Sequence, residues 1–225
     1  MNITIKISGH IIFPSLSSTS KFKGYVDCIK AVKELGHTPF IVMGGGEPAR
    51  YYIRIARENG MDESTCDQMG IAVANINAKI FARALGDIAC QFIPTDFDML
   101  DHAISTGKIV VMGGLQPGQS TNAVAAVLAE RSASKLFINT TTVDGMYDSD
   151  PKKNPKAKKL TKISIKEVAK ILDLSGARAG EHELLDQVAI KIIERSGIIT
   201  KIIDGKDPKN ILKSINGGIG TTILP

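Results

Sequence analysis

The chain has 225 residues and a mass of 24.1 kDa, with 43% hydrophobic and 23% charged residues. This composition is ordinary for a folded globular protein, and it excludes a disordered chain, a collagen-like chain and a disulfide scaffold. The formal net charge is +5, but residues 151–170 carry +7 and the rest of the chain carries −2. We therefore expect a near-neutral body with one basic segment and no nucleic-acid partner.

Apolar residues recur with alternating helical and strand periods along the chain. In chain order the pattern predicts a strand at 3–7, a helix at 21–35, a strand at 38–43, helices at 47–59 and 62–85, a strand at 91–93, a helix at 96–105, a strand at 108–112, a helix at 121–131, a strand at 135–139, helices at 164–172 and 184–195, a strand at 199–203, a helix at 208–214 and a strand at 220–223. Short apolar strands between helices favour an α/β fold with a mostly parallel sheet covered on both faces. A composition shift near 148–163 separates two lobes of one domain.

Cysteine usage and apolar runs bear on the location of the protein. Cys28, Cys66 and Cys90 are scattered, with no Cys-x-x-Cys pair, which is typical of a reducing compartment. No apolar run approaches the ~20 residues of a membrane-spanning helix, and the N-terminal residues lack the features of a signal peptide. We therefore expect a cytoplasmic protein without a membrane partner.

The residues that follow three predicted strands are typical of anion binding. Lys6 closes the first strand just before Gly9, and glycines 44–46 follow the second strand, with Arg50 on the next helical turn. A third glycine-rich stretch, 113–121, follows the strand at 108–112. The carboxyl ends of parallel strands meet helix N-termini, whose amides and dipole favour anions. These three loops therefore predict phosphate binding at one edge of the sheet.

Two of the loops restrict the kind of phosphate site. The stretch 113–121 nearly matches a P-loop, but Gln119 stands where that loop has its lysine, so backbone amides and hydroxyls would have to hold the phosphate. The segment 140–151 ends a strand with hydroxyl groups and continues with acids. There Asp144 could order a lysine or a metal, and Tyr147 could pack on a base. Together, the loops predict two phosphate-bearing ligands.

Other chemistries lack their residues. The four histidines, at positions 10, 37, 102 and 182, have no metal-ligand spacing, so we expect no metal site built from protein ligands. The G-x-S-x-G motif of acyl-transfer enzymes is missing. The stretch 44–49 fits the loose dinucleotide pattern, but the acids that follow, Asp62, Glu63 and Asp67, begin a helical stretch instead of ending a second strand. This counts against a nicotinamide cofactor.

The motifs, in this order, resemble those of the amino acid kinase superfamily, and most of all the archaeal uridylate (UMP) kinases. The resemblance runs along essentially the whole chain. It rests on Lys6 to Gly9, on residues 42–46 with Arg50, on residues 113–126, and on residues 143–151. It implies a three-layer α/β/α sandwich with a mostly parallel open sheet of about eight strands. It also implies an acceptor (UMP) lobe of roughly residues 1–135 and an ATP lobe of residues 136–225 around that sheet.

The resemblance further implies transfer of the γ-phosphoryl group of ATP to UMP, giving UDP. It implies Mg²⁺ bound through the ATP phosphates, and a homohexamer built from dimers. The catalytic residues that it indicates are Lys6, Asp144 and Lys191. The ATP-binding residues that it indicates are Lys6, Gly9, His10, Gly46, Arg50, Thr141, Thr142, Tyr147 and Asp150. The UMP-binding residues that it indicates are Gly45, Asp67, Leu115, Gln116, Pro117, Gly118, Gln119, Ser120 and Thr121.

Departures from the family pattern leave alternatives open. Thr142 stands where asparagine is common, and Asn122 stands where aspartate is frequent. Another acceptor, such as isopentenyl phosphate or a carboxylate, is one alternative, although Met43 occupies the place where isopentenyl phosphate kinases carry a histidine. A non-catalytic nucleotide sensor on the same fold is the other. The phosphate of UMP is already an anion, because its second pKa is near ~6, so the kinase hypothesis requires no general base.

Overall fold

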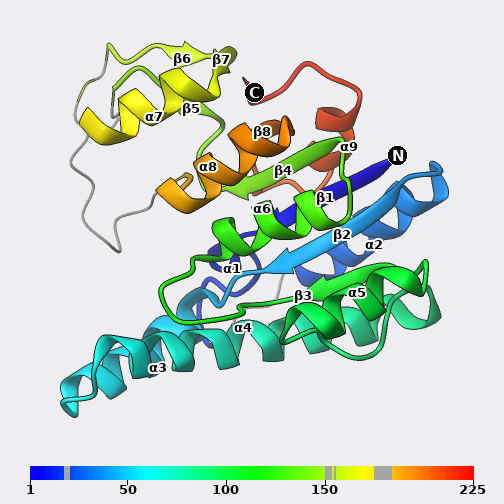
Figure 1. Cartoon of the computed structure of the whole chain (residues 1–225), viewed down its shortest axis with the longest axis vertical. Helices are drawn as coiled ribbons and strands as arrows, with labels where there is room; N and C mark the ends of the chain where they lie inside the picture. Colours follow the sequence, from blue (N-terminus) through cyan, green and yellow to red (C-terminus); the bar gives the residue numbers. More distant parts are fainter. Residues whose placement is uncertain (18–20, 150–153, 155, 175–183) are drawn as a thin grey trace.

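Strands and helices alternate along the chain much as the sequence predicts, and they form three layers in the computed structural model (Figure 1). The structure describes all residues except 18–20, 150–153, 155 and 175–183. The elements, in chain order, are β1 (Asn2–Ile7), α1 (Gly9–Ile12), α2 (Phe22–Glu34), β2 (Thr38–Met43), α3 (Gly46–Glu58), α4 (Glu63–Leu85), a short 3₁₀ turn (Gly86–Ile88), α5 (Phe97–Ser105), β3 (Val110–Met112), α6 (Thr121–Arg131), β4 (Leu136–Thr141), β5 (Met146–Tyr147), β6 (Lys159–Leu160), β7 (Lys162–Ser164), α7 (Ile165–Leu174), α8 (Gln187–Ser196), β8 (Ile199–Asp204), α9 (Asn210–Ile215) and β9 (Thr221–Leu224).

The described residues form one seven-stranded sheet in the order β3-β2-β1-β4-β8-β9-β7 and a small β5-β6 hairpin. The strands from β3 to β8 run parallel, and β9 is antiparallel to β8. Strand β1 lies between β2 and β4, and Lys6 pairs in register with Val42 on one side and Asn139 on the other. The carboxyl ends of these three strands therefore meet at one edge, as the sequence predicts (Figure 1).

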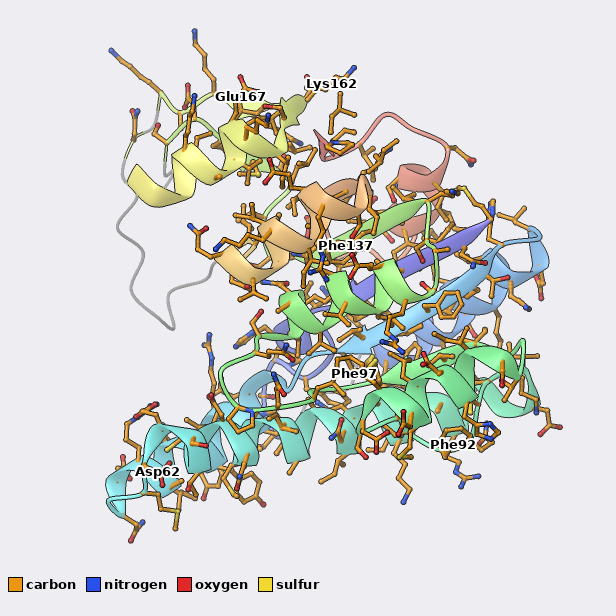
Figure 2. All side chains as sticks on the ribbon, in the orientation of Figure 1. Asp62, Phe92, Phe97, Phe137, Lys162 and Glu167 are labelled. Carbon is orange, nitrogen blue, oxygen red and sulfur yellow. The ribbon has the colours of Figure 1, made fainter. Side chains whose placement is uncertain are left out.

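The core is divided between the two faces of the sheet because side chains alternate along each strand. Ile3, Ile5 and Ile7 of β1 belong to the cluster packed by α2 and α4. Phe137 of β4 belongs to the opposite cluster, packed by α6 and α8, and Figure 2 shows it in the middle of the molecule beneath these helices. The even-numbered positions of β1, including Lys6, therefore face α6 and α8.

The predicted strand at 91–93 is wrong. Residues 91–93 form no strand, and the single pairing in this region is an isolated parallel bridge between Ala89 and Ile109 among the residues described. The side-chain amide of Gln91 donates to the carbonyls of Ala82, Gly86 and Ala89, which end the preceding helix and turn. Because Pro94 has no N–H to donate, the segment has little capacity for a ladder.

Several short elements were not predicted, because two to four residues carry too little periodicity to detect. They are α1, the strand β7 at the start of a predicted helix, and the β5-β6 hairpin. Thr221 of β9 secures the hairpin: its hydroxyl accepts a hydrogen bond from Met146 N at 2.7 Å and donates to the Leu160 carbonyl. The hairpin is therefore attached to the main sheet next to the end of β4.

Candidate active site

A cavity of about 230 Å³ lies where the glycine turns meet helices α3 and α4. Its wall includes seven residues that the sequence assigned to nucleotide binding: His10, Gly45, Gly46, Arg50, Asp67, Gln119 and Thr121. The remaining lining is small or apolar, and comprises Ala49, Ile53, Gly70, Ile71, Ala74 and Gly114. The turn after β2 and the loop after β3 thus open into one common cavity, with the start of α1 beside them.

The glycines at this cavity allow the backbone at Gly9 to lie close to the backbone at Gly46. A Cβ on Gly9 would lie 2.1 Å from the Gly46 nitrogen, and a Cβ on Gly46 would lie 2.6 Å from the Gly9 carbonyl oxygen. Gly46 has a positive φ of 70°, a conformation that glycine adopts without strain. The Gly44 amide donates to the Ile7 carbonyl at 2.9 Å. In the first turn of α3, Glu47 N donates to the Phe13 carbonyl at 3.1 Å and Pro48 has no N–H. The amides that remain for an anion at this turn are therefore those of Gly45 and Gly46.

Helix α4 fixes both glycine loops. Asn77, buried in α4, donates from its amide to the Gly44 and Gly45 carbonyls at 2.9 and 3.1 Å. Near the start of α4, Asp67 accepts a hydrogen bond from the Gly118 amide at 2.8 Å. The carboxylate therefore holds the loop after β3 over the cavity, and it lines the cavity as well.

Sequence reasoning missed the apolar face of α4 in this wall. Gly70, Ile71 and Ala74 follow Asp67 at intervals of three, four and seven residues, so they lie on the same side of the helix. A helical projection drawn from Asp67 would have found them, because the spacing is that of one helix face.

Lys6 lies partly buried at the end of β1, facing the N-termini of α6 and α8. Burial lowers the pKa of Lys6 to about 8, and the negative charge of Asp186 partly opposes this effect. Asp186 caps α8 by accepting from the Ala189 amide at 2.9 Å, and it also accepts a hydrogen bond from the Ser120 hydroxyl. Ser120 in turn caps α6. Two helix N-termini, one cation and one acid thus converge.

Sequence reasoning also missed Asp186 as the acid beside Lys6. The two residues are 180 positions apart in the chain, so no local spacing relates them. The signal that was available is modest: an aspartate directly before an apolar helical stretch is a typical N-cap. Because helix N-termini collect at the carboxyl edge of a parallel sheet, such a cap belongs near the predicted anion site.

Asp144 forms its ion pair with Lys159. Its carboxylate accepts from the Lys159 ammonium and from the Tyr147 hydroxyl, each at 2.8 Å. The hydrogen bond from Lys159 is the main cause that holds the pKa of Asp144 below its usual value. The same carboxylate raises the pKa of Tyr147. Lys159 of the hairpin thus holds Asp144, and Asp144 holds Tyr147, which the sequence predicted as an ATP-binding residue. The pairing of Asp144 with Lys159 was not predicted.

The other predicted residues are placed as follows. Thr141 is buried at the end of β4, where its hydroxyl donates to the Val143 carbonyl at 2.8 Å, and Thr142 is exposed beside it. Lys191 lies on the exposed side of α8, and among the described residues no hydrogen bond or ion pair joins it to Asp144, whose ion pair is with Lys159. Asp150 lies outside the described residues. The structure therefore brings the predicted UMP residues together more fully than the three predicted catalytic residues.

Among the described residues, no group of three histidine, cysteine, aspartate or glutamate side chains is placed to hold a metal ion. Within that same part of the chain, none of the helices combines the length and the apolar character that crossing a membrane requires.

Comparisons with known proteins agree with this geometry. The amino acid kinase family matches residues 1–204. The chain is 44% identical over 225 residues to a uridylate kinase of Methanothermobacter thermautotrophicus, with 100% of both chains covered. It is 40% identical to a uridylate kinase of Methanocaldococcus jannaschii, covering 100% of this chain and 99% of that one. The crystal structure of uridylate kinase from Archaeoglobus fulgidus superposes with a TM-score of 0.87 at 36% identity, covering 99% of this chain and 100% of that one. The predicted three-layer α/β fold is thereby confirmed, and this chain belongs to the amino acid kinase family.

Proposed function

We propose that this protein is a uridylate kinase that transfers the γ-phosphoryl group of ATP to UMP and releases UDP and ADP. The observation that carries the proposal is the common cavity of about 230 Å³, which Arg50, Asp67 and the glycine turn at Gly45 and Gly46 line together. The full-length identity to uridylate kinases agrees with this acceptor. Neither a carboxylate nor isopentenyl phosphate as acceptor, nor a sensor without catalysis, is favoured by any feature of the site.

The acceptor side is assigned to the cavity. An anionic phosphate is suited to the amides of Gly45 and Gly46 and to the guanidinium of Arg50. The resemblance gave Gly46 and Arg50 to ATP, and we propose that they contact the UMP phosphate instead, because they line the same cavity as Asp67. The carboxylate of Asp67 accepts hydrogen bonds, as a ribose hydroxyl would require. The apolar side chains of Ile53 and Ile71 give a base a surface to pack on. Residues 115–121 cover this space from the loop after β3.

The donor side is assigned to the end of β4 and the hairpin. Thr141, Thr142 and Tyr147 supply hydroxyl groups and a ring there, and Asp144 with Lys159 fixes the tyrosine. Strand β1 separates this region from the acceptor cavity, because β2 flanks it on one side and β4 on the other. We infer an acceptor lobe of roughly residues 1–135 and a donor lobe of residues 136–225, which meet at Lys6.

Phosphoryl transfer requires alignment of two anions and neutralisation of their charge. The phosphate of UMP is the nucleophile and is already ionised near neutral pH, so no side chain needs to remove a proton. The ammonium of Lys6 stands between the two sides and would stabilise the transferring group together with the N-termini of α6 and α8. Asp186 keeps this cation charged. We also propose Lys191 as a second cation for the transferring phosphoryl group, and only the family resemblance supports this role.

Mg²⁺ fits this arrangement as a companion of the nucleotide. It prefers oxygen ligands and retains water, and it commonly binds through substrate phosphates with one or two carboxylates. Asp144, beyond the end of β4, supplies a carboxylate on the donor side, while no three-ligand cluster exists among the described residues. When bound, Mg²⁺ would neutralise charge on the ATP phosphates, and Asp144 would help to orient the complex. The three cysteines have no disulfide partners, which agrees with a cytoplasmic location.

We also infer a homo-oligomer, a homohexamer built from dimers, with contacts through α4. Ile76 and Ile80 lie one turn apart on this helix and are 57% and 49% exposed, although isoleucine is normally buried. Ile80→Glu should lower the sedimentation coefficient of the protein. Leu35→Glu, an exposed leucine after α2, serves as the control and should leave it unchanged. Equal sedimentation of both variants and the parent would contradict this interface.

The activity is tested with ATP, Mg²⁺ and a panel of acceptors: UMP, CMP, dUMP, isopentenyl phosphate and acetylglutamate. Nucleotide products are separated by ion exchange, and ³¹P spectra identify the new phosphoanhydride. We expect UDP to form with the highest kcat/KM in the panel, and Lys6→Met to abolish its formation. Phosphorylation of a carboxylate or of isopentenyl phosphate in preference to UMP would refute the proposal, as would ATP binding without any turnover.

A further inference from the structure

A buried asparagine beside Lys6 connects the elements that surround the proposed catalytic cation. Asn139 lies on β4, is 0% exposed, and is the register partner of Lys6. It follows Phe137 by two residues, so it faces α6 and α8 with Lys6. Burying a side-chain amide in a central strand costs free energy unless its polar atoms are hydrogen bonded. The hydrogen-bond partners of Asn139 therefore show what the residue holds in place.

The two protons of the Asn139 amide reach two different elements. Nδ2 donates to Oδ1 of Asn122 on α6 at 3.2 Å and to the Leu184 carbonyl, just before α8, at 2.6 Å. Asn122 lies two residues after Ser120, the N-cap of α6, and Leu184 lies two residues before Asp186, the N-cap of α8. One side chain therefore sets where both helices begin, and these two caps hydrogen bond to each other.

The oxygen of the Asn139 amide makes no hydrogen bond in the described part of the chain, where Oδ1 is buried. The charged group that acts on Lys6 is Asp186, which raises the pKa of Lys6 against the larger effect of burial. Asn139 therefore bears on Lys6 through the helix starts that its Nδ2 holds, because Leu184 lies two residues before Asp186.

We propose that Asn139 is a positioning residue for the phosphoryl transfer: it holds the N-termini of α6 and α8, with Ser120 and Asp186, around Lys6. This rests on the proposed kinase function. Asn139 touches neither nucleotide in this proposal and acts through the groups that it fixes. Removing its amide releases the Leu184 carbonyl, so the start of α8 can move and carry Asp186 away from Lys6. Small displacements of aligned groups are enough to reduce turnover strongly.

The test replaces Asn139 by valine, which suits a central strand and has no hydrogen-bonding groups. We expect kcat to fall about ten- to a hundredfold. The KM for UMP should change less than kcat, because most of the acceptor cavity is built on α3 and α4 and only Gln119 and Thr121 adjoin the start of α6. The matched control is Thr4→Val. Thr4 is fully buried on the same face of β1, and its hydroxyl is hydrogen bonded to Ser134 at 2.9 Å, away from the site. This variant should keep the parent kcat.

A second measurement does not depend on turnover. The ¹³Cε shift of Lys6 is followed against pH in the parent, in Asn139→Val and in Thr4→Val. We expect the pKa of Lys6 to fall in Asn139→Val alone. In an Asn139→Val, Asp186→Asn double variant the two shifts should be less than additive, because both act through the same acid. Asn139→Leu, which retains the branched side-chain shape and adds no charge, replaces the valine variant if that chain does not fold; it cannot donate to Leu184, so its kcat should fall as well.

The outcomes separate the two proposals. A parent that does not phosphorylate UMP refutes the kinase function, whereas the titration of Lys6 still decides the role of Asn139. A parent kinase whose Asn139→Val variant keeps its kcat and its Lys6 pKa overturns the positioning role. Equal loss of activity in Asn139→Val and Thr4→Val, in proportion to their loss of stability, overturns it too, because that is the result of a purely structural contribution.

Discussion

The charge of Lys6 provides a quantitative test of the proposed mechanism. Burial lowers the pKa of Lys6 to about 8, from 10.5 for an ordinary lysine. If the protonated ammonium binds the transferring phosphoryl group, kcat/KM must fall as pH rises through this value. A group with a pKa of about 8 is about 90% protonated at pH 7 and about 10% protonated at pH 9, so kcat/KM at pH 9 should be about a tenth of its plateau.

Two variants change this profile in opposite ways. Asp186→Asn removes the negative charge that raises the pKa of Lys6, so the alkaline fall should move to lower pH. Asparagine remains a good N-cap and can still accept from Ser120, which keeps the change electrostatic. Lys6→Arg keeps a positive charge across the whole range, so the alkaline fall should vanish, whatever the absolute rate.

The assay is the initial rate of UDP formation between about pH 6 and pH 10, with each substrate varied in turn at saturation of the other. The pH dependence of kcat/KM reports the free enzyme, and that of kcat reports the complex. Bound phosphates favour the ammonium, so the fall in kcat should occur at higher pH than the fall in kcat/KM. A fall in kcat/KM near 10.5, or an alkaline shift in Asp186→Asn, would refute the reasoning.

The same pKa fixes the sign of a stability effect. The pKa of Lys6 in the folded state is about 8, below the unfolded value of 10.5. Between these values the unfolded chain binds more protons, so this group adds stability as pH rises through that window. At neutral pH the buried charge is therefore unfavourable, and Lys6→Met should abolish activity while the melting temperature stays equal or rises. A large fall in melting temperature would assign Lys6 a structural role.

The remaining predictions concern three sites. Asp67→Asn should raise the KM for UMP about tenfold, since it removes a charged hydrogen-bond acceptor but keeps an oxygen for the Gly118 amide; an unchanged UMP KM with an altered ATP KM would contradict the ribose assignment. Lys159→Gln breaks the ion pair with Asp144 and should raise the KM for ATP but not for UMP in steady-state assays; the reverse pattern would place the hairpin on the acceptor side. Gly9→Ala puts a Cβ 2.1 Å from a backbone nitrogen and should lower the free energy of unfolding in urea by about 3 kcal/mol; parent-like stability would show that the turn yields.

The parts of the fold that were predictable are those with a complete local signal. Helix α6 spans Thr121–Arg131 as predicted, because Ser120 is a strong N-cap before an apolar, alanine-rich run. The strand at 38–43 also agrees, since six consecutive residues suit burial on both faces. The β5-β6 hairpin was missed because its pairing depends on Thr221, a residue far away in the sequence. At residues 91–93 a strand was predicted where none forms. The side chain of Gln91 instead donates to carbonyls at the end of α4 and the turn after it.

The candidate site divides in the same way. The glycine loops could be found because a strand end, a glycine and a helix start are adjacent in the chain. Their packing could not, since the clash of a Gly9 Cβ with Gly46 depends on two loops meeting in space. Asp144 and Lys159 are separated by residues 145–158, whose sequence has no periodic pattern that would predict their pairing. The approach of Asp186 to Lys6 depends on the order of the strands in the whole sheet.

Lys6 must satisfy two opposed requirements, and its surroundings meet both. A cation acts strongly on a phosphoryl group only where water is largely excluded, because the effective dielectric is then low. The same exclusion favours the neutral amine and would remove the charge at physiological pH. Asp186 reduces this loss, and its place is fixed because, as a helix cap, it accepts hydrogen bonds from the Ala189 amide and the Ser120 hydroxyl. When ATP and UMP bind, their phosphates add negative charge beside Lys6 and raise its pKa further. The site is thus poised so that the lysine is most fully charged when both substrates are bound.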